Sequence, residues 1–313
     1  MLFHGCSKVV TVLVLILALI GVFIYNIVDY DVYVRQLVRM PRPTTPQPKN
    51  DTSSVADKLP LRVMFIGASI TRGEVSTGDR GYRKQVRDAL VSWGNPVNSV
   101  GFNRFGDWND NDVEGWGAYR IRTITKNAAQ SIPALQPNLI IVQVGTSDCF
   151  QNDDTANIGS RYRLLADTMM QAEPRATMIL STLVTTPDPK YEPCILSANE
   201  MIRNVTADLI SEKKPVVLSE MHYDQGLPDR PTPQDIGPDN IHPTDQGYAM
   251  MGNILLQSIR EVEAKEFLQR PGNNSIPYNG DDSDSREIED RIKNQTEAAH
   301  PINRRSTGMM FEG

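Results

Sequence analysis

The sequence predicts an α/β protein with a parallel sheet and helices on both of its faces. Short strand-like segments alternate with longer helical ones between residues 61 and 267, and this alternation is typical of a parallel sheet. The strongest strand, Asn138–Val144, reads NLIIVQV, a continuous apolar run of the kind buried on both faces of a sheet. Polar candidates for chemistry follow the strands, and ligands of such sheets bind at the carboxyl ends of strands.

Five strands and five helices account for this region. The expected strands are Arg62–Ile66, Val97–Phe102, Asn138–Val144, Thr177–Leu183 and Val216–Ser219. The expected helices are Arg83–Trp93, Tyr119–Ala129, Ala156–Ala172, Leu196–Glu212 and Thr244–Phe267. Breaking residues delimit several of them: Gly94-Asn95-Pro96 follows the first helix, Pro174 the third and Pro215 the fourth.

Composition excludes some classes of function. The chain of 313 residues carries a net charge of −6 and no basic stripe, so a nucleic-acid partner is not expected. Three cysteines are too few for a disulfide scaffold. Neither Cys-x-x-Cys nor His-Glu-x-x-His occurs, so no metal site is expected.

The N-terminal segment predicts a membrane anchor. Residues 9–28 contain no charge, and twenty such residues are about the length of a membrane-spanning helix. We expect an uncleaved signal anchor, with a cleaved secretory signal as the alternative. The resulting division is a short head at 1–8, the anchor at 9–28, a Pro/Thr-rich stem at 29–60, the α/β domain at 61–268 and a polar, disordered tail at 269–313.

Two signals give opposite orientations of this anchor. Arg35, Arg39 and Arg42 follow the span, and such charges favour a cytoplasmic body. Four Asn-x-Ser/Thr triplets favour a lumenal or extracellular body, which is the orientation we expect. These possible glycosylation sites are Asn50, Asn204, Asn273 and Asn294.

Three residues, far apart in the sequence, form a candidate catalytic set. Ser69 follows the first strand, and Asp239 precedes His242 by three residues in a late loop. A serine hydroxyl needs a base to accept its proton, and a carboxylate can orient the imidazole that does so. The plainer interpretations are a helix N-cap for Ser69 and a partly buried loop histidine for His242. Together the residues favour acyl transfer by a Ser-His-Asp triad.

The oxyanion of a tetrahedral intermediate also needs hydrogen-bond donors. The candidates are the backbone N–H of Ser69, a backbone N–H of Gly117 or Ala118, and the hydroxyl of Ser147.

Four segments resemble the blocks of the SGNH (GDSL-type) hydrolase superfamily. They are Gly67–Thr71, Asp112–Ile121, Gly145–Asp148 and Asp239–Thr244. The resemblance covers about residues 61–265, and the phrase Asn-Asp-x-Glu-Gly is most similar to carbohydrate esterase family three, including fungal acetylxylan-esterase-like proteins. It implies a flavodoxin-like three-layer sandwich, a five-stranded parallel sheet with strand order 2-1-3-4-5, and hydrolysis without a cofactor.

The chain departs from the pattern of this superfamily at three positions. Ala68 replaces an aspartate, and the glycine of the second block falls on Ala118, or on Gly117 with a shift of one residue. Ser147 replaces an asparagine of the oxyanion hole, and loss of such a donor costs roughly two to three orders of magnitude in rate when nothing replaces it. The resemblance is therefore consistent with a slow esterase or with a differently built hole.

Two cysteines and a tryptophan border the predicted site. Cys149 follows the third block and Cys194 lies after the fourth strand, so a disulfide is expected in a lumenal body; two free thiols are the alternative. Trp116 either lines the acyl or sugar pocket or packs structurally.

We therefore expect a membrane-anchored serine esterase that acts on small-molecule or glycan esters, with short acyl groups on carbohydrate favoured by the resemblance. Two alternatives stay open: a lysophospholipid-type lipid esterase, and a non-catalytic glycan-binding or scaffold protein on the same fold.

Overall fold

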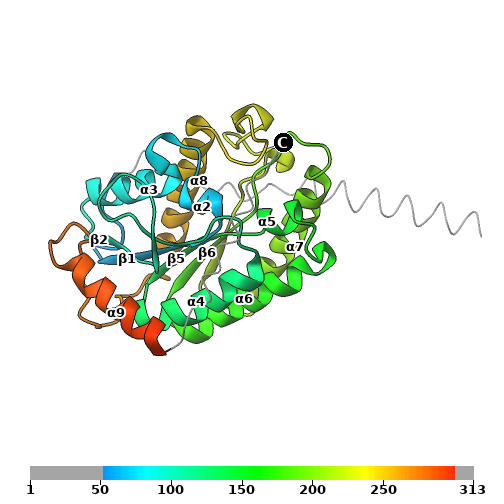
Figure 1. The fold of residues 1–313 in the computed structure, drawn as a ribbon. Helices are drawn as coiled ribbons and strands as arrows, with labels where there is room; N and C mark the ends of the chain where they lie inside the picture. Colours follow the sequence, from blue (N-terminus) through cyan, green and yellow to red (C-terminus); the bar gives the residue numbers. More distant parts are fainter. Residues whose placement is uncertain (1–51, 300–313) are drawn as a thin grey trace, which may run out of the picture. The chain divides into compact units, whose positions relative to one another are not determined.

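The computed structural model describes residues 52–299, which form an α/β domain (Figure 1). Its strands are β1 (Leu61–Gly67), β2 (Val97–Ser99), β3 (Asn103–Arg104), β4 (Asp112–Gly115), β5 (Leu139–Gln143), β6 (Thr177–Ser181) and β7 (Val216–Ser219). Its helices are α2 (Ser69–Arg72), α3 (Gly81–Ser92), α4 (Ile121–Leu135), α5 (Thr146–Phe150), α6 (Ile158–Ala172), α7 (Glu192–Ser211), α8 (Asp245–Ala264) and α9 (Ser285–Ala299).

Five parallel strands form the main sheet. β1 pairs with β2 and β5, β5 with β6, and β6 with β7, all parallel. Numbered by their order along the chain, these strands stand in the predicted order 2-1-3-4-5. Each predicted strand and helix therefore has a counterpart, with ends that differ by a few residues.

The prediction of five strands is nevertheless wrong, because the sheet of the described residues has seven. β3 and β4 form an antiparallel hairpin, and β4 pairs with the carboxyl end of β1 at Ile66 and Gly67. β5 occupies one edge of β1, so β2 and β4 share the other edge. The hairpin matters because it returns the chain beside the last residue of β1.

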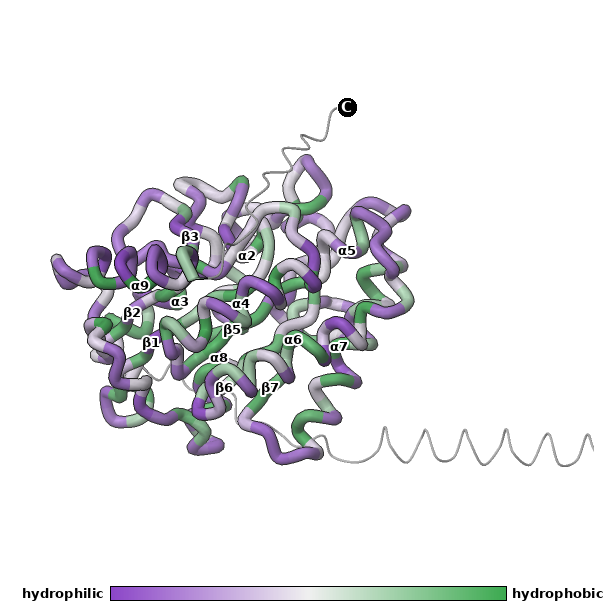
Figure 2. The backbone as a smooth tube through the Cα atoms, turned by 60° about the horizontal axis from the view of Figure 1, so that its bottom comes forward, coloured by the Kyte–Doolittle hydropathy of each residue, from purple (hydrophilic) through white to green (hydrophobic). Residues whose placement is uncertain are grey.

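Alternation along the strands builds two hydrophobic layers. Met64 and Ile66 of β1 face the cluster that contains residues of α4, α6 and α7, whereas Val63 and Phe65 face the cluster of α3 and α8. Successive strand residues point to opposite faces, so the sheet lies between two helical layers (Figure 1). Figure 2 shows apolar residues gathered on the strands and on the helix faces around them.

The predicted disordered tail needs correction between residues 269 and 299. This segment packs on the domain and contains α9, which is largely hydrophilic (Figure 2). The buried guanidinium of Arg62 donates hydrogen bonds to the carbonyls of Gly272 and Ile276, at 3.0 and 3.1 Å. Asn98 donates to the Glu289 carboxylate at 3.0 Å. A polar composition did not reveal that these buried donors need partners from the tail.

The predicted stem also reaches into the domain. Val55 is fully buried, and its backbone N–H donates to Asn95 at 2.8 Å, so residues 52–60 belong to the packed body. The predicted head, the predicted anchor at 9–28 and most of the stem lie outside the described residues. Within residues 52–299, no helix has the length and apolarity needed to cross a membrane.

The buried Glu289 carboxyl group on α9 should make the stability of the fold depend on pH. Burial, together with the negative charge of Asp112, raises the pKa of Glu289 from 4.5 to about 8. The folded chain therefore binds more protons than the unfolded chain between these two pH values, so stability falls as the pH rises through this window. We expect Glu289→Gln to remove about 3 kcal/mol of the loss in unfolding free energy between pH 5.5 and 8.5, measured by urea titration. Exposed Glu287 on the same helix provides the control, and equal pH slopes for Glu289→Gln and wild type would contradict this prediction.

Candidate functional site

Ser69 lies at the sharp turn between β1 and α2. It is partly buried and is the first residue of α2 rather than its N-cap. A side chain at Gly67 would place its Cβ 2.1 Å from the carbonyl oxygen of Gln143, so only glycine fits there. The Thr71 hydroxyl donates to the same carbonyl at 3.0 Å. The turn that presents Ser69 is thereby fixed to the carboxyl end of β5.

Asp239 and His242 form a direct pair in the loop before α8. The Asp239 Oδ2 and His242 Nδ1 atoms are 2.6 Å apart. Oδ1 of the carboxylate accepts the backbone N–H groups of Ile241 and His242, at 2.9 and 3.0 Å. Burial raises the pKa of Asp239, but these hydrogen bonds outweigh it and hold the pKa below its ordinary value. The carboxylate is therefore ionised and orients the imidazole.

The second imidazole nitrogen is left available. Nε2 of His242 is buried and makes no hydrogen bond within residues 52–299. Because Nδ1 faces a carboxylate, which only accepts, the proton of the neutral imidazole belongs on Nδ1. Nε2 then carries a lone pair and can accept a proton from a hydroxyl group.

Contacts between α8 and the segment after α2 bring the segment that carries Ser69 and the loop that carries Asp239 and His242 to the same edge of the sheet. Tyr248 donates a hydrogen bond to the carbonyl of Glu74 at 2.9 Å. The backbone N–H and the hydroxyl of Thr77 donate to the Asp245 carboxylate, at 2.8 and 2.6 Å. Glu74 follows Ser69 by five residues, and Asp245 follows His242 by three.

The candidate oxyanion donors also lie around this turn. The Trp116 backbone N–H donates to the Gly67 carbonyl at 3.1 Å, and a Cβ at Gly117 would lie 2.8 Å from Arg72 Nη1. Ala118 has a positive φ of 58°. Ser147 is buried in α5, directly after the strand β5 that neighbours β1. The β3–β4 hairpin and the carboxyl end of β5 therefore flank the segment that carries Ser69.

Glu114 is a site residue whose role the sequence did not reveal. Its fully buried carboxylate accepts the backbone N–H of Phe102 at 3.0 Å and the indole N–H of Trp116 at 3.1 Å. The Trp116 ring also stacks on Tyr119, with centroids 5.7 Å apart. Burial raises the pKa of Glu114. This arrangement fixes Trp116 beside the predicted oxyanion turn, so both packing and pocket-lining roles fit its position.

The structure joins Cys149 and Cys194 in a disulfide between α5 and α7. The neighbouring rings of Phe150 and Tyr191 stack with centroids 4.1 Å apart. The bond links the helix that contains Ser147 to the first turn of α7.

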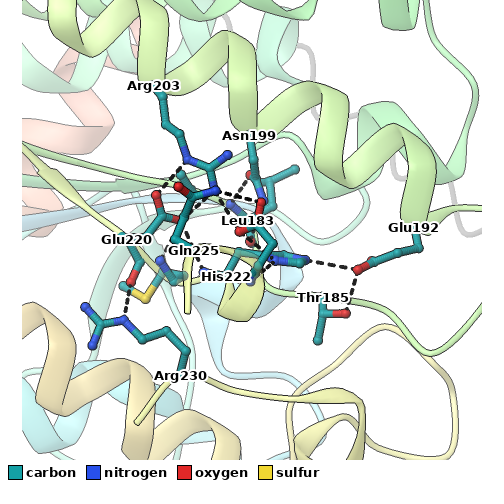
Figure 3. A network of polar contacts seen from close by, with 12 residues as sticks. Leu183, Thr185, Glu192, Asn199, Arg203, Glu220, His222, Gln225 and Arg230 are labelled. Atoms are coloured by element: carbon teal, nitrogen blue, oxygen red, sulfur yellow. Dashed lines mark hydrogen bonds and ion pairs between the residues drawn. The ribbon is translucent and has the colours of Figure 1, made fainter. Parts of the chain in front are cut away.

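The sequence analysis also did not predict a polar network that joins α7 to the segment after β7. His222 is buried, with Nε2 3.0 Å from Glu192 Oε1, and its Nδ1 accepts the backbone N–H of Asp224 (Figure 3). Arg203 and Glu220 form an ion pair at 2.7 Å in the same network. Arg203 and Glu220 are 17 residues apart, and Glu192 and His222 are 30 apart, so no local motif indicates these pairs.

A polar cavity of about 230 Å³ opens beside the N-terminus of α8. Its lining residues come from the segment after α2, from α3 and from α8: Ser76, Thr77, Arg80, Gly81, Gln85, Asp245, Tyr248 and Ala249. Within the described part of the chain, no group of three or more His, Cys, Asp or Glu side chains is arranged to hold a metal ion.

Comparison with solved structures shows the same fold in several carbohydrate esterases. A family 3 carbohydrate esterase of Clostridium thermocellum has a TM-score of 0.57 at 21% identity, covering 66% of this chain and 98% of its own. A family 3 carbohydrate esterase of Talaromyces cellulolyticus has a TM-score of 0.53 at 22% identity, covering 64% and 99%. A mutant acetyl esterase with an acetate ion has a TM-score of 0.55 at 22% identity, covering 64% and 99%.

No curated protein sequence matches the chain. Residues 65–250, however, match the GDSL-like lipase/acylhydrolase family. This range contains every residue of the candidate catalytic set and of the candidate oxyanion donors. The chain therefore belongs to the GDSL-like lipase/acylhydrolase family, as its motifs predicted, and is a carboxylic ester hydrolase by class.

Proposed function

We propose that the protein is a serine esterase in which Ser69, His242 and Asp239 form the catalytic triad. The observation that carries this proposal is the Asp239–His242 pair, because it leaves the histidine with a buried Nε2 that makes no hydrogen bond among the described residues. Ser69 Oγ attacks the ester carbonyl while its proton passes to Nε2. The C–O bond to the alcohol then breaks, and His242 returns the proton to the departing oxygen. Water repeats the sequence and releases the acid.

The oxyanion of each tetrahedral intermediate is held by the backbone N–H of Ser69, by that of Gly117 or Ala118, and by the hydroxyl of Ser147. Donors aimed at this oxygen stabilise charge that develops only in the transition state. The position of Ser147 in the first turn of α5, the helix that follows β5, supports its part in this set.

The test of this function is a labelling reaction on the purified full-length chain. A fluorophosphonate probe should modify Ser69, identified by mass spectrometry of the labelled peptide, and the protein should hydrolyse p-nitrophenyl acetate. Absence of both labelling and hydrolysis would contradict the esterase and favour the non-catalytic binding protein suggested by Ala68, Ala118 and Ser147.

We also propose short acyl esters of carbohydrates as the substrates. The leaving alcohol must reach His242, which precedes α8 by three residues, and the polar cavity opens beside the N-terminus of this helix. Arginine, glutamine and aspartate side chains there suit the hydroxyl groups of a sugar better than the chain of a lipid. The fold shared with family 3 carbohydrate esterases is consistent with this substrate class. Steep loss of kcat/KM with acyl length would separate it from a lysophospholipid-type esterase.

Gln85 provides a specific test of the sugar subsite. Its amide lines the cavity and donates to Asn253 at 2.7 Å. We expect Gln85→Ala to raise the KM for an acetylated xylo-oligosaccharide, relative to that for p-nitrophenyl acetate, by about five-fold, as expected for roughly 1 kcal/mol of lost hydrogen bonding. Exposed Gln257 on α8 is the matched control. An unchanged KM ratio in Gln85→Ala would place the sugar elsewhere.

For the location, we propose a single-pass membrane protein with a lumenal or extracellular body. The disulfide supports an oxidising compartment, and the asparagines of three sequons, Asn204, Asn273 and Asn294, are exposed. A loss of apparent mass on enzymatic removal of N-glycans checks the proposal; protease sensitivity of the body from the cytoplasmic side would contradict it.

A further inference from the structure

The loop after β6 contacts the Asp239–His242 loop through one hydroxyl group. Thr186 Oγ1 donates a hydrogen bond to the carbonyl of Asn240 at 2.6 Å. The other hydrogen bonds of this segment are local, such as those from Gly237 N–H to His242 O at 2.8 Å and from Asn240 N–H to Gly237 O at 3.0 Å. Thr186 therefore links this segment directly to the loop after β6.

The bonded carbonyl belongs to the peptide unit that holds the catalytic carboxylate. The N–H of that peptide unit is the N–H of Ile241, which donates to Asp239 Oδ1 at 2.9 Å. Asn240 itself has a left-handed φ of 60°, a conformation that asparagine adopts more readily than most non-glycine residues. Rotation of this peptide would withdraw the N–H from Asp239, and Thr186 opposes that rotation.

Thr186 is in turn held by Glu192 at the start of α7. Its backbone N–H donates to Glu192 Oε2 at 2.9 Å, while Oε1 accepts from the Thr185 hydroxyl at 2.9 Å. Oε1 also contacts the buried His222 ring at 3.0 Å (Figure 3). Both Thr185 and Thr186 are buried. Two residues further along α7, the disulfide fixes Cys194 to α5.

We propose that Thr186 and Glu192 are positioning residues for the Asp239–His242 pair, acting through the peptide between Asn240 and Ile241. This inference rests on the proposed esterase function. The Asp239 side chain is 37% exposed, so water competes for its oxygens, and a fixed peptide N–H keeps Oδ2 directed at His242. Thr186 touches neither the substrate nor the reacting atoms; it controls the direction in which the carboxylate points.

Thr186→Val removes the hydroxyl at nearly constant volume, and Thr186→Ser keeps it. Thr177→Val on β6 is the matched control, because Thr177 is also buried and its hydroxyl donates to a distant backbone carbonyl, that of Phe267 at 2.8 Å. We expect Thr186→Val to lower kcat for p-nitrophenyl acetate by on the order of 10- to 100-fold, as for small misplacements of catalytic groups, with KM changed less than about two-fold. Thr186→Ser should recover kcat to within about three-fold of wild type, since only a methyl group is lost.

A spectroscopic readout separates positioning from activity. The proton on His242 Nδ1, shared with a carboxylate, gives a far-downfield ¹H NMR signal in the full-length chain, assigned by its loss in His242→Gln. We expect this signal to shift or broaden in Thr186→Val and to be retained in Thr186→Ser and Thr177→Val. Glu192→Gln, which keeps only one acceptor oxygen, should show a smaller change of the same kind and serves if Thr186→Val does not fold.

The outcomes are distinguishable. If wild type neither labels nor hydrolyses esters, the proposed function fails, and the NMR signal still decides the positioning role. If wild type is active while Thr186→Val and Glu192→Gln match Thr177→Val in kcat and in the downfield signal, the positioning role is overturned and the esterase stands.

Discussion

Ser69→Ala is expected to lower kcat for p-nitrophenyl acetate by on the order of 10⁴-fold or more, with the fold intact. The reason is chemical: alanine offers no oxygen to form the acyl-enzyme, so only transition-state binding by the oxyanion donors is left. The position of Ser69 in the first turn of α2 requires no side-chain hydrogen bond for the helix to form, so stability should change little. Single-turnover kinetics and fluorophosphonate labelling provide the measurements.

Ser92→Ala is the control for this substitution. Ser92 is exposed on α3, and its hydroxyl donates to the Ala89 carbonyl at 2.7 Å, so its loss should leave kcat within about two-fold of wild type. Turnover in Ser69→Ala equal to that of Ser92→Ala would remove Ser69 from the mechanism and direct attention to another nucleophile.

Asp239→Asn is expected to produce the second-largest effect, a fall in kcat of roughly 10³- to 10⁴-fold. An amide can donate its N–H to His242 Nδ1 and so favour the tautomer that has the proton on Nε2, which cannot then accept one. The neutral amide also fails to stabilise the imidazolium that forms as Ser69 attacks. Steady-state kinetics across pH measure both effects, and exposed Asp208 on α7 is a matched Asp→Asn control.

The pH dependence follows from the sign of the Asp239 shift. Its pKa lies below the ordinary 3.8, so the contribution of the ionised pair to stability is fully present above pH 3.8 and is lost as the pH falls through the lower folded value. Wild-type stability should therefore lose this contribution only in strong acid, whereas Asp239→Asn should lack it at every pH. If the unfolding free energies of wild type and Asp239→Asn fell in the same way at acid pH, the Asp239 carboxylate would not be held as an ion.

Hydrophobic pattern and turn residues were sufficient to predict the parallel sheet. The strand order implied by the family resemblance is present in β2, β1, β5, β6 and β7, and the predicted helices occur between them. These elements could be predicted because the central strands are short, continuous apolar runs and the helices each bury an apolar face. Strands β3 and β4 were missed because they are short and polar, and pairing with β1 rather than intrinsic preference makes them strands.

Part of the candidate site could be predicted from the short spacing of its residues in the sequence. Asp239 and His242 are close in sequence, so their spacing indicated a pair. His222 and Glu192 are 30 residues apart, and Arg62 and Ile276 are 214 apart; such contacts depend on tertiary packing that one sequence does not encode locally. The tail was predicted to be disordered because its hydrogen bonds to buried donors of the domain are contacts of this long-range kind.

The Cys149–Cys194 bond, with a sequence separation of 45, encloses α6 and β6 in a covalent ring. A protease that cuts once inside this ring leaves both pieces tethered, so the nicked chain keeps its full mass until a thiol reagent is added. A single cut in the helical layer therefore releases no fragment, and the two ends of the disulfide-closed segment stay attached next to the candidate site.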